Sequence, residues 1–132
     1  MPKVVQERQD FSELNESLMD DIVHGGLITP GAAVNVNVQP FVGTLGGVDF
    51  ESVGATNLAT AAPGTAGESI RYNIVSDDTG TVSAVAGAAA TTGSQVAPAL
   101  AAGTVLLGTV DVANGAASIV QSDIKHIGRN WL

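Results

Sequence analysis

The strongest constraint on the fold is the alternation of side chains between residues 70 and 112. In residues 70–75 apolar and more polar side chains alternate with a period of two, as in a β-strand with one buried face. Turn-forming residues occupy positions 77–80, and the alternation resumes in residues 82–86. Aspartate and glycine favour tight hairpin turns. The pattern therefore predicts a β-hairpin, which a third strand in residues 104–112 extends into a β-meander.

Further short strands are expected on both sides of this meander. Proline has no N–H group, so Pro40 ends the pairing of the strand before it or places that strand at a sheet edge. Gly46 and Gly47 mark a hairpin turn, and the Asn114-Gly115 pair predicts another. Residues 86–102, nearly all small, are expected to form a long surface loop. The further predicted strands cover residues 34–38, 41–45, 48–51, 57–60 and 117–120.

The composition agrees with a mainly β chain. Its 132 residues include 16 Gly and five Pro, and aromatic residues make up 4%, which suits short strands and tight turns. We expect an antiparallel β-sandwich or jelly-roll-like domain of about eight short strands. Apolar burial stabilises a fold by about 25 cal/mol per Å², and aromatic side chains supply much of that area. A single copy would thus have a weak core, and we expect self-association, as a homotrimer.

The N-terminal residues predict a separate element. Phe11, Leu14, Leu18 and Ile22 recur at spacings of three, four and four, which indicates an amphipathic helix ending at the glycines 25–26. The expected organisation is a helical arm over residues 1–26 and a β-sandwich domain over residues 27–132. The apolar stripe of the helix can lie on its own domain, pair with other copies of the helix, or dock on another protein.

Charge and cysteine content exclude several classes of function. The formal net charge is −8 with only five Lys and Arg, which argues against nucleic acid and anionic membranes as partners, because both require a basic face. No apolar run approaches the roughly 20 residues that span a bilayer, and the N-terminus lacks the pattern of a signal peptide. Without cysteine there is no disulfide, thiolate nucleophile or Cys-based zinc site.

No group of residues predicts catalysis, a cofactor or a bound metal. His24 and His126 stand outside any recognisable metal or triad spacing, so both are interpreted as capping or surface residues. Calcium prefers oxygen-rich turns, but no loop has the ligand number of a calcium motif, and aspartate in turns is ordinary. The protein is therefore expected not to be an enzyme. The acidic residues considered for calcium are Asp49, Glu51, Asp77 and Asp78.

The C-terminal residues 124–132 offer a second candidate contact. Trp131, the sole tryptophan, can anchor a partner or close the bottom of its own domain. Together with the helix stripe, this end of the chain supplies the candidate partner-binding residues. They are Phe11, Leu14, Leu18, Ile22, Ile127, Trp131 and Leu132.

The meander also carries a family resemblance. Arg-Tyr-Asn-Ile-Val at 71–75, Asp-Thr-Gly-Thr-Val-Ser-Ala-Val-Ala-Gly at 78–87 and Pro-Ala-Leu-Ala-Ala-Gly-Thr-Val-Leu-Leu-Gly-Thr-Val at 98–110 resemble a β module of tailed-bacteriophage virion proteins. Such modules occur near the attachment ends of head and tail fibres and in small capsid or baseplate accessory proteins. Residues 27–38 are similar to the opening strand of the module, so the resemblance extends over roughly residues 27–123.

The resemblance implies a structural component of a virion that is assembled in the host cytoplasm. In fibre proteins the module usually precedes a long shaft, which does not follow here. We therefore expect a capsid decoration or head-fibre protein that associates with itself and with other virion proteins. A peripheral tail, neck or baseplate adaptor is the close alternative.

A small carbohydrate-binding module is the more distant alternative. Sugar sites usually present several exposed aromatic rings as stacking platforms. Three of the aromatic residues of this chain fall at expected core or helix positions. The five aromatic residues are Phe11, Phe41, Phe50, Tyr72 and Trp131.

Overall fold

The computed structural model describes residues 21–126, which are mainly β: eleven strands and one short 3₁₀-helix, η1 (Gln121–Asp123). The strands form three antiparallel sheets. Their bounds are β1 Asp21–Gly25, β2 Ile28–Pro30, β3 Asn35–Val38, β4 Phe41–Leu45, β5 Val48–Ser52, β6 Ala55–Ala59, β7 Glu68–Ser76, β8 Val82–Ala86, β9 Ala90–Thr91, β10 Val105–Ala113 and β11 Ile124–His126.

Strands β7 and β10 form the centre of the largest sheet, whose order is β11-β10-β7-β8, with β9 pairing the start of β7. Tyr72 on β7 lies opposite Val110 on β10 and Ala86 on β8. The predicted strands and the turn between β7 and β8 are confirmed, but the predicted meander order is wrong. The third strand pairs with β7 rather than β8, because the long segment between β8 and β10 crosses over β7 and returns on its other side.

That connecting segment, residues 87–104, packs against the outer face of β7. The Asn73 side chain donates from Nδ2 to the Pro98 carbonyl at 2.8 Å. A Cβ atom at Gly87 would lie 2.5 Å from the Val96 carbonyl oxygen, so the absence of a side chain there permits this close approach. Strand β7 is consequently buried on both faces from Tyr72 to Ser76, where the sequence alternation predicted one buried face.

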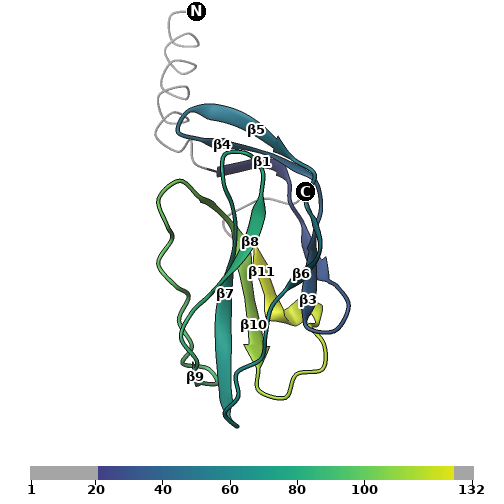
Figure 1. Cartoon of the computed structure of the whole chain (residues 1–132), viewed down its shortest axis with the longest axis vertical. Helices are drawn as coiled ribbons and strands as arrows, with labels where there is room; N and C mark the ends of the chain where they lie inside the picture. Colours follow the sequence, from purple (N-terminus) through teal and green to yellow (C-terminus); the bar gives the residue numbers. More distant parts are fainter. Residues whose placement is uncertain (1–20, 127–132) are drawn as a thin grey trace, which may run out of the picture.

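The two smaller sheets have the orders β2-β3-β6 and β1-β4-β5. In Figure 1 the long strands β7 and β10 stand vertically, β3 and β6 lie to their right, and the β4–β5 hairpin crosses the upper end. Residues 21–25, assigned to the helix by the sequence pattern, instead form β1, which pairs with β4. The β-branched residues Ile22 and Val23 suit this strand, and the rest of the predicted helix lies outside the described residues.

All three sheets contribute to one hydrophobic core built mainly from aliphatic side chains. Ile28, Ile74 and Leu107 are fully buried. Phe41 and Phe50 make an edge-to-face contact with their ring centroids 6.0 Å apart, an arrangement that aromatic pairs favour.

The sheets also meet along their edges. Beside β11, the backbone N–H of Ile28 on β2 donates to His126 Nε2 at 2.9 Å, while β6 lies beside β8 at the opposite edge. The connection from β6 to β7 is held by the Tyr72 hydroxyl, which donates to the carbonyl of Ala61 and accepts from its N–H group, each at 2.9 Å.

None of the helices within residues 21–126 is long and apolar enough to cross a membrane.

The predicted strand over residues 117–120 is wrong. A turn does form at Asn114-Gly115, with the Ala116 N–H donating to the Ala113 carbonyl, but no hairpin follows it. Ile119 is instead buried in the core, and its N–H donates to the Ala33 carbonyl. The chain then continues through η1 to β11, which occupies the free edge of β10.

Candidate interaction surfaces

The residues predicted to bind partners have different placements. Ile22 on β1 is only 5% exposed and belongs to the hydrophobic core, so its assignment to a partner-binding stripe is wrong. Its burial follows from the strand conformation of β1, which pairs with β4 and turns this side chain into the core. The other members of the set lie outside residues 21–126: Phe11, Leu14, Leu18, Ile127, Trp131 and Leu132.

The two histidines have structural and surface positions. The imidazole of His126 joins two sheet edges by accepting the Ile28 N–H. His24 on β1 is exposed. It lies opposite Val42 on β4, and Val42 lies opposite Glu51 on β5. These three side chains line an open hollow of about 280 Å³ on the outer face of the β1-β4-β5 sheet. The hollow is shallow, and it brings one imidazole and one carboxylate to the same face.

Two segments that carry acidic residues considered for calcium, β5 and the β7–β8 turn, lie close together, but neutral groups make the contact between them. The Ser52 hydroxyl at the end of β5 donates to the Gly80 carbonyl at 2.6 Å. Asp77 uses its Oδ1 atom within the β7–β8 turn, where it accepts from the Thr79 hydroxyl at 2.6 Å and from the Thr81 N–H at 3.0 Å. Across residues 21–126, no three carboxylate, histidine or cysteine side chains gather into a possible metal site.

These hydrogen bonds, led by that from the Thr79 hydroxyl, lower the pKa of Asp77 below its usual value of 3.8. A lowered pKa in the folded state stabilises the protein above the unfolded-state pKa, and the contribution is lost as the pH falls through the folded-state pKa. We therefore expect wild-type protein to be more stable than Asp77→Ala near neutral pH, and the difference to narrow below about pH 4.

Urea unfolding at several pH values measures this difference. Asp78→Ala is the matched control, since Asp78 is exposed and is not the acceptor of these turn hydrogen bonds. A gap between wild type and Asp77→Ala that stayed constant down to about pH 2 would contradict the role of the Asp77 carboxylate.

The described aromatic side chains do not form a surface for sugars. Phe41, Phe50 and Tyr72 are all buried in the core, and stacking on a sugar requires an exposed ring face. Residues 21–126 therefore present no aromatic platform of the kind that carbohydrate-binding modules use.

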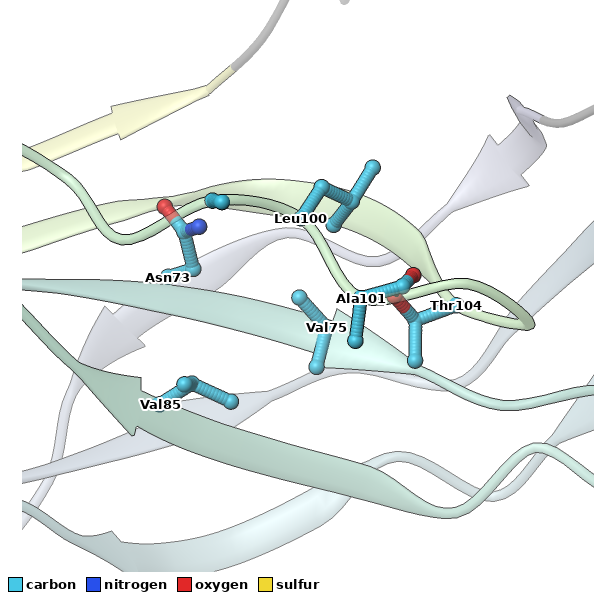
Figure 2. Close-up of a pocket in the computed structure, with 7 residues that line it drawn as sticks. Asn73, Val75, Val85, Leu100, Ala101 and Thr104 are labelled. Carbon is cyan, nitrogen blue, oxygen red and sulfur yellow. The ribbon is translucent and has the colours of Figure 1, made fainter.

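An apolar surface that the sequence interpretation missed lies over β7 and β8. Val85 on β8 and Leu100 on the connecting segment are both exposed large apolar residues. Figure 2 shows them on either side of Val75, where a small cavity of about 40 Å³ is also lined by Ala101 and Thr104. Residues 79–110 contain no acidic, basic or histidine side chain, and this lack of charge was the available signal.

Asn73 lies beneath this surface with an incomplete set of hydrogen bonds. Its side-chain N–H group is used by Pro98, but its Oδ1 atom is buried without a hydrogen-bond partner among the described residues. An unpartnered buried acceptor costs about 1–3 kcal/mol. The packing of the connecting segment on β7 thus buries the Asn73 Oδ1 atom at a cost to the stability of the fold.

The margin of this surface carries one ion pair. Arg71 on β7 donates two hydrogen bonds to Asp111 on β10, at 2.7 and 3.1 Å. The side-chain hydrogen bonding with Asp111 raises the pKa of Arg71 above its usual value. The pair therefore contributes little net charge where it stands.

In comparisons with known proteins, no family model, curated protein or solved structure matches this chain.

Proposed function

We propose that this protein is a non-enzymatic structural component of a bacteriophage virion, a capsid decoration or head-fibre protein that associates with itself and attaches to the particle. The observation that carries a binding role is the uncharged apolar surface around Val85 and Leu100 on a chain of net charge −8. Exposed apolar patches of this kind commonly contact other proteins. The resemblance to virion modules supports the virion as the place where this binding occurs. The residues that carry the resemblance, 71–75, 78–87 and 98–110, overlap β7, β8 and β10.

The arrangement of the sheets supports a β-sandwich as the finer description of the fold. The β2-β3-β6 sheet has β2 beside β11 and β6 beside β8, which are the two edges of the larger sheet. Side chains from both sheets meet in the same core. These contacts support our proposal that two antiparallel sheets pack face to face.

Virion purification tests the proposal. Particles of the phage that encodes this chain, purified by density gradient, are expected to contain it when analysed by mass spectrometry. Their reconstruction by electron microscopy is expected to place it on the capsid. Absence from purified particles would contradict the virion role, and a position at the tail, neck or baseplate would replace decoration with an adaptor role.

The same particles test the proposed attachment helix. Substituting Leu14→Asp and Leu18→Asp together removes two apolar side chains from the predicted stripe, so incorporation is expected to be lost. Circular dichroism of the purified variant checks that the β domain remains folded. Normal incorporation of a folded variant would contradict attachment through this stripe.

A further inference from the structure

The charge distribution divides the surface of this protein into two kinds. Residues 79–110 carry no ionisable side chain, and their polar residues are neutral amides and hydroxyls, whereas the net charge of −8 comes from carboxylates elsewhere in the sequence. On the described part, Asp49 and Glu51 project from β5, and Asp77 and Asp78 occupy the β7–β8 turn. Two copies of such an acidic chain meet with least repulsion where neither presents a carboxylate.

The uncharged part also contains much of the exposed apolar area. Leu100 is 50% exposed and Val85 is 41% exposed, and both border the small cavity above Val75. Figure 2 shows the Leu100 side chain extending from the connecting segment beside this cavity. Val96, on the same segment, is 72% exposed. The centres of protein interfaces are depleted in charge and enriched in large apolar side chains.

The connecting segment is held in place well enough to present these side chains in a defined position. Its Pro98 carbonyl accepts from the buried Asn73 side chain, and the Val96 carbonyl sits close over Gly87. A surface that is already ordered loses less conformational entropy when it binds. The segment is therefore suited to act as part of an interface.

We propose that the face formed by Val85, Val96, Leu100 and the adjoining cavity is the contact between copies of this chain. An apolar side chain of the second copy enters the cavity, and the Arg71–Asp111 pair lies at the margin, where its two charges offset each other. A basic protein partner would be drawn instead to the carboxylates of β5 and the β7–β8 turn. This assignment rests on the proposed self-association and names the surface responsible for it.

Light scattering at a series of protein concentrations tests the assignment. Leu100→Asp places a carboxylate at the centre of the face, so the dissociation constant of the oligomer is expected to rise at least about tenfold. Val96→Asp is expected to act in the same direction. Both side chains are at least half exposed, so the variants should fold, and circular dichroism verifies this.

Val53→Asp is the matched control, because Val53 is an apolar residue 91% exposed directly after β5 and does not line the cavity. Its oligomer should be as tight as that of wild type. Oligomers of Leu100→Asp and Val96→Asp as tight as wild type would overturn the assignment while self-association stands. A wild-type monomer at micromolar concentration would overturn both, whereas the virion role is decided separately by particle composition.

Discussion

Asn73→Asp is expected to lower the free energy of unfolding by about 3–5 kcal/mol at pH 7, because it leaves a charge buried without a compensating partner. The Asn73 side chain is 3% exposed, and its N–H group faces the Pro98 carbonyl. A carboxylate at this position would place negative charge against that carbonyl oxygen. The connecting segment would then either separate from β7 or hold an unfavourable contact.

The defect should depend on pH with a defined sign. Burial raises the pKa of the introduced carboxyl in the folded state, and the protonated form can still donate to Pro98. The variant is therefore expected to approach wild-type stability below the unfolded-state pKa of about 3.9, and to lose it as the pH rises toward the folded-state pKa. Urea unfolding at pH values from 3 to 8, each compared with wild type, measures this profile.

Asn73→Leu is the matched control for that experiment. It has a similar size and removes the unpartnered Oδ1 acceptor, but it also leaves the Pro98 carbonyl without its donor, so it should lower the free energy of unfolding by about 1–2 kcal/mol, less than Asn73→Asp. It should also show no additional pH dependence. Equal stability of the Asp and Leu variants at pH 7 would mean that position 73 is open to solvent.

The second large effect is expected at Gly80 in the β7–β8 turn. Gly80 has φ +82°, and a Cβ atom there would collide with the Glu51 carbonyl oxygen on β5. An L-residue with left-handed backbone loses about 1–2 kcal/mol, and the collision adds to this loss because the Glu51 carbonyl belongs to the backbone and cannot move aside as a flexible side chain could. Gly80→Ala is therefore expected to lower the free energy of unfolding by about 3 kcal/mol, measured by urea unfolding.

Gly103→Ala separates the two contributions. Gly103 has a similar φ of +77°, but nothing lies within 4 Å of its missing Cβ. Its substitution should cost only the backbone term of about 1–2 kcal/mol. Equal losses for the two variants would show that the turn does not dock against β5 as described.

Most strands could be predicted from the sequence because local side-chain alternation specifies them. Phe41–Leu45, Val48–Ser52 and the β7–β8 pair were expected at nearly their observed bounds. Strand order was not predictable in this way. The pairing of β10 with β7 depends on the path of residues 87–104, and nothing local in an Ala-rich segment indicates which side of β7 it crosses.

The errors at the two ends of the β domain have physical causes of the same kind. A spacing of three and four residues linked Ile22 to a helix stripe, but pairing with β4 and burial in the core outweigh that periodicity. The Asn114-Gly115 turn formed, but Ile119 is buried in the core, so the residues after the turn do not pair back as a hairpin. Tertiary packing thus overrode local pattern in both places.

The apolar face around Leu100 was missed for a different reason. Amphipathic and aromatic residues were the expected partner contacts, and the long loop between β8 and β10 contains neither an amphipathic pattern nor an aromatic residue. The lack of charge in residues 79–110 was visible from the outset. Its meaning depended on the packing of the segment onto β7, which brings Val85 and Leu100 to one cavity.

The bond between Ile28 and His126 has a consequence for how the domain is made. The two residues are 98 positions apart in the chain, and β2 meets β11 along this edge. Such distant contacts slow folding, because the chain must close a large loop before they form. During synthesis, β2 leaves the ribosome long before β11, and this edge of the domain cannot close until residue 126 has emerged.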